Sequence, residues 1–359
     1  MRILRSLGEN MSLWIGNNIE IDIKGKSHDK RIEGRMSSFN KGFKIDFDEL
    51  NTFMERRSPG KGELISKRKE NDIIHFISGI DGNTLNGEDI GIYILNEDVR
   101  SNDYNNMKLL RPGHSDYVSL LKFGRTFPGS GPFSGRLSAI LTAFGGISLQ
   151  FLNEYNIYVA SKIISIKDIK RDGFDTLSND RNELIYEDIN DEMKELIRET
   201  RENKDSLGGI IQLKAINIPK ALGYPYTNNL KARISNAIFS IPGVMGIEFG
   251  RGFEASILYG SENNDSYIYK DKEIIYKSNN SGGIQGGISN GQPIILNISI
   301  KPTASIGKKQ RTVDIIEEKN SFIETKGRHD PAFILRVPPI LESMFSLVIL
   351  DELIEEGVL

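Results

Sequence analysis

The stretch from residue 134 to 155, SGRLSAILTAFGGISLQFLNEY, places apolar side chains at the spacing of an α-helix. Ser134 precedes the first apolar residue and is of a type that caps helix N-termini. The pattern predicts a long buried helix, and it predicts that the Gly145–Gly146 pair marks close helix packing rather than a cofactor contact. The apolar stripe consists of Leu137, Ile140, Leu141, Phe144, Ile147, Phe151 and Leu152.

Predicted strands lie on both sides of this helix in the sequence. The β-branched runs 73–80 and 90–95 are separated by the turn-like DGNTLNGED and are typical of two adjacent strands. Because such hairpin-like neighbours recur, we expect a sheet-and-helix sandwich of the α+β class rather than a strictly parallel, doubly wound fold. The further strands predicted are 156–166, 208–218, 244–250, 254–260 and 292–300, and the further helices are 187–203, 228–240 and 339–355.

The chain shows no fixed-period repeat, and the polar stretch 167–206 is its one linker-like segment. We therefore expect a single interleaved domain. The apolar run MFSLVIL at 344–350 is too short to cross a bilayer, and the N-terminus has no apolar signal region. These features predict neither a membrane partner nor a membrane anchor.

Composition limits the classes of function. The 359 residues contain no cysteine, which excludes a disulfide framework, thiolate catalysis and cysteine-ligated zinc, and which fits a cytoplasmic location. The net charge is −3 and the isoelectric point is about 6.0, which argues against nucleic-acid binding driven by phosphate neutralisation. The balance favours a small-molecule partner, and no metal site is predicted.

The four histidines divide into two groups. His75 lies inside an apolar strand and is predicted to be a packed histidine. His28, His114 and His329 lie in the turn-like segments GKSHD, RPGHSD and KGRHDP, each of which supplies glycine, a carboxylate and a cation. Side chains on such loops often converge on sites, although ordinary surface loops remain an open alternative.

The segment 278–306, SNNSGGIQGGISNGQPIILNISIKPTASI, combines many glycines with Lys301, Thr303 and Ser305. Glycine frees backbone N–H groups to approach an anion, so we expect residues 281–305 to wrap a phosphate. No G-x-x-x-x-G-K-[ST] sequence precedes a helix and no G-x-G-x-x-G follows a clean strand, so nucleotide hydrolysis and Rossmann-type dinucleotide binding lose support.

Seven segments, in order, resemble the chorismate synthase family: NNIEIDIKGKSHD, FMERRSPGKGELISKRKE, NEDVRSNDYNNMKLLRPGHSDY, GPFSGRLSA, the 278–306 segment, QRTVD and KGRHDPAFILRVPPILESM. The resemblance covers about residues 11–355 and is most specific at 278–313 and 326–344. Met11 matches the usual start of the family, so residues 1–10 are expected to be an extension or a mis-called start, ahead of a family domain at 11–359.

The resemblance implies a β-α-β sandwich fold and a carbon–oxygen lyase of aromatic amino-acid biosynthesis. That enzyme converts 5-enolpyruvylshikimate 3-phosphate to chorismate and phosphate by a 1,4-anti elimination that needs reduced FMN. It also implies a cytoplasmic homotetramer with flavin near subunit contacts. Whether reduced flavin comes from a built-in, NADP-dependent activity or from an external flavin reductase stays open.

The resemblance also implies roles for individual residues, which fall into three groups. The catalytic residues implied are His28 at the leaving phosphate, His114 at the reduced flavin and Asp330 in proton removal from the substrate. The cofactor-binding residues implied are Ser134, Arg136, Gly286, Lys301, Pro302, Thr303, Ala304, Ser305 and Arg328. The substrate-binding residues implied are Arg57, Arg136 and Arg68.

The sequence departs from the family pattern at several places. Lys26 and Asp29 replace a glutamate and a glycine of the first motif, Ser58 replaces an arginine, and Pro132 replaces a histidine found in one branch. Residues 29–38 lack the usual apolar strand, so we expect the first strand pair to be altered. Two alternatives follow, a catalytically weakened or inactive paralogue that still binds flavin or anions, and a related elimination with a changed substrate pocket around Arg57 and Glu63.

Overall fold

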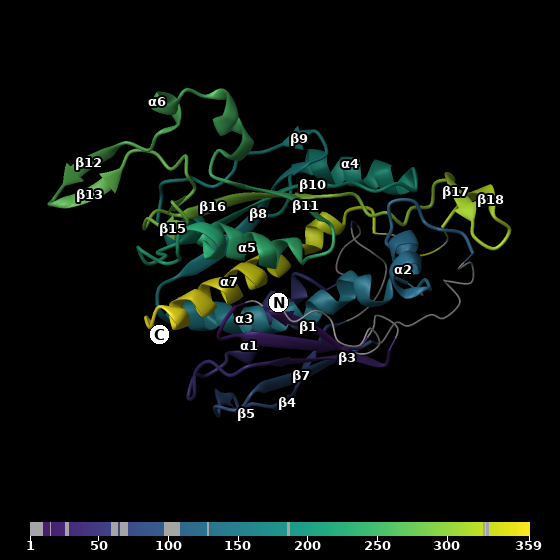
Figure 1. The fold of residues 1–359 in the computed structure, drawn as a ribbon, viewed down its shortest axis with the longest axis horizontal. Helices are drawn as coiled ribbons and strands as arrows, with labels where there is room; N and C mark the ends of the chain where they lie inside the picture. Colours follow the sequence, from purple (N-terminus) through teal and green to yellow (C-terminus); the bar gives the residue numbers. More distant parts are fainter. Residues whose placement is uncertain are drawn as a thin grey trace.

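The computed structural model describes residues 10–14, 16–25, 29–58, 64, 71–96, 108–127, 129–184, 187–325, 327 and 330–359. Two five-stranded antiparallel sheets enclose a layer of helices (Figure 1). The first sheet contains β1 (Asn10–Trp14), β2 (Glu20–Lys24), β3 (Arg31–Met36), β7 (Ile90–Leu95) and β4 (Ile74–Ser78), in that order. The second contains β11 (Val244–Phe249), β16 (Ile294–Ile300), β10 (Gly209–Ile216), β8 (Tyr158–Ile166) and β9 (Ile169–Lys170). The expected α+β sandwich is confirmed.

The helical layer is built on close packing between two buried helices. These are α3 (Ser138–Glu154) and α7 (Pro338–Glu355), and α1 (Phe47–Glu55) and α5 (Leu230–Phe239) pack beside them. A Cβ added to Gly145 of α3 would lie 2.1 Å from the Cβ of Ser343 on α7, so only glycine permits this approach. Gly146 faces α1 in the same way. The prediction that this glycine pair serves helix packing is confirmed.

The predicted helix at 134–155 begins four residues later than expected. The Ser134 hydroxyl accepts a 3.2 Å hydrogen bond from the Arg136 amide and caps a short 3₁₀ turn, η3 (Gly135–Leu137), that leads into α3. Within the described part of the chain, Gly135–Glu154 is the one helix long and apolar enough to cross a membrane, and 89% of its most apolar window is buried inside the protein.

The expectation of an altered first strand pair is wrong. Residues 31–36 form β3, which pairs with β2 and with β7. Only alternate residues of β3 face the helices, and these are the buried Ile32 and Met36 with Gly34 between them. Gly34 lies directly against Ile140 and Phe144 of α3, so charged residues at the intervening positions do not disturb the strand.

The predicted strand at 254–260 is also wrong. Residues 252–257 form a 3₁₀ helix, η6 (Gly252–Ile257), and α6 (Gly260–Asn263) follows. Gly250 and Gly252 have positive φ angles of 58° and 53° and turn the chain away from β11, so no sheet neighbour is available. Phe253, Ile257 and Tyr259 of this segment are consequently exposed.

The remaining elements lie outside the two large sheets or on their faces. The predicted helix at 187–203 is α4 (Asp191–Glu202), which packs through Met193 and Ile197. The hairpin β12 (Tyr267–Lys270) and β13 (Glu273–Tyr276) projects from one end of the molecule (Figure 1). The others are β5 (Ile80–Asp81), β6 (Thr84–Leu85), α2 (Asp116–Phe123), η2 (Gly131–Phe133), η4 (Arg181–Glu183), η5 (Tyr226–Asn228), β14 (Ile284–Gln285), β15 (Ile288–Ser289), β17 (Gln310–Asp314), β18 (Lys319–Ile323) and η7 (Phe333–Arg336).

Candidate active site

A histidine loop at the start of α2 forms one wall of the candidate site. Asp116, the first residue of α2, accepts hydrogen bonds from Arg111 Nε at 2.8 Å, Arg111 Nη2 at 2.7 Å and the Arg111 amide at 3.0 Å. His114 Nδ1 lies 2.8 Å from the same carboxylate. Burial alone would raise the pKa of Asp116, but the hydrogen bonds from Arg111 and His114 outweigh it and hold that pKa far below its usual range. Asp116 is therefore an ionised acceptor at neutral pH.

The second nitrogen of His114 faces a serine. Nε2 lies 2.9 Å from Ser130 Oγ, and the Ser130 hydroxyl donates its one hydrogen to the Gly129 carbonyl at 2.5 Å. Both ring nitrogens therefore face oxygen atoms that can accept a hydrogen bond, Ser130 Oγ at Nε2 and the Asp116 carboxylate at Nδ1.

The segment that follows β16 forms the opposite wall. Lys301 Nζ donates a 3.1 Å hydrogen bond to the Gly113 carbonyl, and Arg111 Nη1 donates one of 3.3 Å to Ser305 Oγ. A Cβ on Gly113 would lie 3.7 Å from the Cβ of Ala304, so the two segments are in contact. Lys301, Ala304 and Ser305 are thus brought to the His114 loop from the far side of the sequence.

Thr303 joins this wall to the C-terminal part of the site. Its hydroxyl donates to the Asp330 carbonyl oxygen at 2.9 Å, and its own carbonyl accepts from Ser206 Oγ at 2.7 Å. The Asp330 carboxylate accepts two hydrogen bonds from Arg336, at 3.1 and 2.7 Å. Pro302 turns the chain beside Gly208, where an added Cβ would lie 2.9 Å from the Pro302 ring.

A buried cluster of charges lies next to Arg336. Arg57 and Arg136 both donate to the carboxylate of Asp72, and Ser58 Oγ donates to the same group at 3.1 Å. Burial lowers the pKa of Arg57 against the attraction of Asp72, and together with the positive charges of Arg136 and Arg336 it brings that pKa to about 10. Burial would raise the pKa of Asp72, but its two arginines outweigh burial and lower it. Ser58 therefore replaces the family's third arginine in a place where a further cation would add repulsion.

The two arginines of this cluster are turned toward protein acceptors. Their side chains are only 3% exposed. Arg136 also donates a 2.8 Å hydrogen bond to Asn96 Oδ1, and Arg57 donates one of 3.2 Å to the Gly135 carbonyl. Contact of Arg57 and Arg136 with a substrate anion stays a prediction. In this structure they hold η3, and with it Ser134, in place.

The structure separates the glycine-rich segment from Lys301. Gly286 and Gly287 form the two-residue turn between β14 and β15, with φ angles of 60° and 89°, while Gly283 lies against Pro293 at the start of β16. Lys301 follows the other end of β16, and its seven residues span about 20 Å when extended. The expectation that residues 281–305 of one chain wrap a single phosphate is therefore wrong, because an extended strand lies between the glycines and the lysine.

Three predicted site residues, His28, Arg68 and Arg328, lie outside the described residues, as do Lys26, Glu63 and His329. His75 is packed as predicted, since its ring stacks on Tyr93 with centroids 4.6 Å apart. Sequence reasoning did not single out four residues that the structure places in the site, which are Asp72, Arg111, Asp116 and Arg336. The spacing R-P-G-H-S-D contained the signal for Arg111 and Asp116, whereas no local pattern marks Asp72.

Comparison with known proteins gives a consistent result. The family description "Chorismate synthase" matches residues 19–354. Chorismate synthase of Korarchaeum cryptofilum is 36% identical over 348 residues, covering 94% of this chain and 96% of that protein. The enzymes of Methanococcus maripaludis and Lancefieldella parvula are 37% and 35% identical and cover 95% and 96% of this chain and 97% and 96% of their own lengths. A crystal structure of chorismate synthase superposes with a TM-score of 0.74 at 22% identity, covering 95% of this chain and 93% of its own, and supports the fold. The chain belongs to the chorismate synthase family.

Proposed function

We propose that this chain converts 5-enolpyruvylshikimate 3-phosphate to chorismate and phosphate by a 1,4-anti elimination. Family membership carries the enzyme class, a carbon–oxygen lyase acting on a phosphate ester. The observation that supports the finer assignment is the contact between the His114 loop and residues 301–305, since it gathers titratable and anion-binding groups from distant parts of the sequence.

The residues in this contact fit reduced FMN. Arg111, His114 and Lys301 are cationic or proton-donating groups, and Ser130, Thr303 and Ser305 add hydroxyls, which together suit a phosphate and the polar edge of a flavin ring. When bound, reduced FMN would supply the electron-rich ring that assists loss of the phosphate, with no net redox change. Ser134, Arg136, Pro302, Ala304 and Arg328 are proposed to complete the cofactor site. Gly286 stays a predicted cofactor contact separate from that of Lys301, because β16 lies between them.

Different side chains of this chain would transfer protons and bind the anionic groups. His114 offers a proton at Nε2 once a ligand replaces Ser130, while Asp116 keeps the other nitrogen protonated. The Asp330 carboxylate accepts hydrogen bonds from Arg336, and we propose that it assists removal of a substrate proton. His28 is proposed to steady the leaving phosphate, and Arg57, Arg68 and Arg136 to attract the substrate's anionic groups.

The expected assembly and setting follow from the family. A cytoplasmic homotetramer, with reduced flavin supplied by an external reductase or by an NADP-dependent activity of its own, is the form we propose. No nucleic-acid or membrane partner is proposed.

A flavin-binding protein without turnover is the second candidate. The observation that favours it is the burial of Arg57 and Arg136 against Asp72, which turns two proposed substrate contacts toward the protein. Turnover distinguishes the two candidates, because both predict flavin binding.

The cofactor assignment is tested by titrating FMN into the protein and following quenching of its fluorescence. Lys301→Ala is expected to weaken binding by about tenfold, as for loss of one charge-assisted hydrogen bond. Lys308→Ala is the matched control, since Lys308 pairs with Asp205 at 2.8 Å and is not a proposed flavin contact. Equal affinity of Lys301→Ala and the wild type would contradict the assignment.

A further inference from the structure

The hairpin of β12 and β13, called the arm below, projects from the end of the molecule where α6 also lies (Figure 1). The pairing Tyr267–Tyr276 and Tyr269–Ile274 places these four side chains on one face of the arm. That face is apolar, yet Tyr269 is 78% exposed and Tyr267 is 60% exposed. A two-stranded hairpin with four-residue strands is at best marginally stable alone in water, so we expect another protein surface to cover this face.

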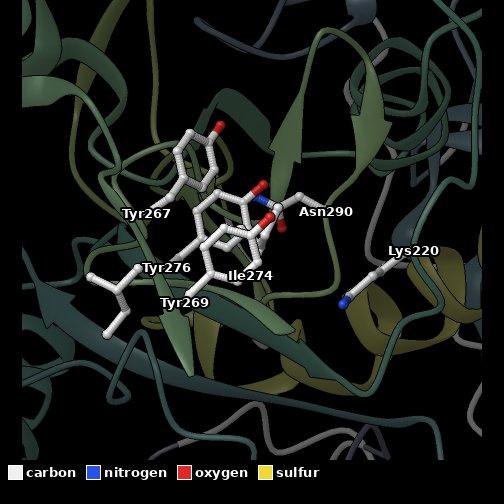
Figure 2. Close-up of a pocket in the computed structure, with 7 residues that line it drawn as sticks. Lys220, Tyr267, Tyr269, Ile274, Tyr276 and Asn290 are labelled. Atoms are coloured by element: carbon white, nitrogen blue, oxygen red, sulfur yellow. The ribbon is translucent and has the colours of Figure 1, made fainter. Parts of the chain in front are cut away.

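The apolar face of the arm lines an open cavity of about 690 Å³, which Lys220 and Asn290 of the body complete. Figure 2 shows the tyrosine rings gathered beside Asn290, with Lys220 set apart from them. The arm is anchored at its base, where the Tyr276 hydroxyl donates a 3.1 Å hydrogen bond to Gln285 Oε1. The cavity is open to solvent and has room for more than one large side chain.

The same end of the chain carries a second apolar surface. Phe253 and Ile257 of η6 and Tyr259 just after it are each more than three-quarters exposed. Large apolar side chains crowded into a few residues of short helix are typical of an interface segment rather than of ordinary surface. This segment directly precedes α6, and α6 precedes the arm in sequence, so one copy presents both an open cavity and an exposed apolar segment.

We propose that the arm is an assembly surface, in which the arm of one copy receives the segment Gly252–Tyr259 of a second copy. If a two-fold axis relates the two copies, the same contact forms twice, because each copy supplies both surfaces. The proposal rests on the homo-oligomer expected of the family and identifies the surface that makes it.

The exposed area is of the size a stable interface needs. With whole side chains of about 200 Å², the exposed fractions of the arm face and of Phe253, Ile257 and Tyr259 leave on the order of 800 Å² of largely apolar surface. A standard interface buries about that area on each partner. The arm tip carries Lys270, Asp271, Lys272 and Glu273, so both signs of charge are present and a second copy meets no net repulsion there.

Molar mass tests the proposal directly and independently of catalysis. Light scattering after size exclusion is expected to give a multimer for the wild type and half that mass or less for Tyr269→Asp. Ile316→Asp is the matched control, because Ile316 is 74% exposed but lies between β17 and β18, far from the arm (Figure 1). A monomeric wild type, or an unchanged mass for Tyr269→Asp, would overturn the proposal even if lyase activity is found.

Cross-linking tests the pairing without disturbing it, since the chain has no cysteine of its own. Ile257→Cys and Tyr269→Cys are co-expressed on differently tagged copies and oxidised mildly. The proposal expects a disulfide-linked pair carrying both tags. A disulfide between two copies of Tyr269→Cys would indicate that arm contacts arm. The absence of any mixed pair would indicate that the copies associate through another surface. Either result rejects the proposed pairing.

Discussion

Asp116→Asn isolates the role of the carboxylate beside His114. The asparagine has nearly the same shape, but it is uncharged, and one of its two oxygens becomes a donor. Asp116 accepts three hydrogen bonds from Arg111 and lies against His114 Nδ1, so at least one of these contacts must be lost. His114 Nδ1 then no longer faces a charged acceptor.

The size of the effect follows from these contacts. Breaking a buried, hydrogen-bonded ion pair costs about 3–5 kcal/mol, and since the asparagine keeps one acceptor we expect a loss near 3 kcal/mol at pH 7. Because the pKa of Asp116 is depressed in the folded protein, its contribution is present above the unfolded pKa, which is near 3.8. The stability difference between wild type and variant should therefore shrink as the pH falls below about 4. Activity should drop by about 10- to 100-fold, as when the carboxylate that orients a functional histidine is removed.

The assay combines urea unfolding with nitrogen NMR of the His114 ring, which is identified by its absence in His114→Gln. The variant should show a changed chemical shift of His114 Nδ1, because the carboxylate that lies 2.8 Å from this nitrogen is gone. Asp314→Asn is the control, because Asp314 is also buried and paired, with Lys108 at 3.2 Å, but does not touch His114. An unchanged Nδ1 chemical shift with activity within twofold of the wild type would refute the reasoning.

Two further substitutions test the packing and the buried charges. Burial raises the pKa of Glu352 against the attraction of Arg233, so stability should fall as pH rises above about 4.5, and Glu352→Gln should flatten that dependence in thermal melts between pH 5 and 8. Gly145→Ala, although favourable to a helix, places a methyl group 2.1 Å from Ser343 and should cost about 1–3 kcal/mol in urea unfolding. Gly260→Ala is the comparison, because nothing lies within 4 Å of its added Cβ, and equal stability of both alanine variants would contradict the packing argument.

Local patterns predicted most of the fold. The apolar repeat at 134–155 gave α3 because nearly every turn of that helix is buried. The prediction of a strand at 254–260 was wrong because the apolar residues there suit a strand as well as a short helix. Only the positive φ angles of Gly250 and Gly252 turn this segment away from the sheet. The strand β3 was not expected because few of its residues are apolar. Alternate burial, however, requires only Ile32 and Met36 to be apolar.

The site was predictable where its residues lie close in sequence. The His114 loop and the 301–305 segment were both identified from short motifs, but their contact depends on the length and direction of β16. The same strand separates Gly286 from Lys301, which no motif reveals. Asp72 holds Arg57 and Arg136 from a different part of the chain, and such a charge cluster becomes visible only after folding.

The central claim is tested most directly by an anaerobic turnover assay with chemically reduced FMN and 5-enolpyruvylshikimate 3-phosphate, following chorismate and phosphate together. We predict equal amounts of both products from the wild type, and loss of both products in His114→Ala. Tight flavin binding without either product from the wild type would contradict the account and leave a cofactor-binding protein of the same fold.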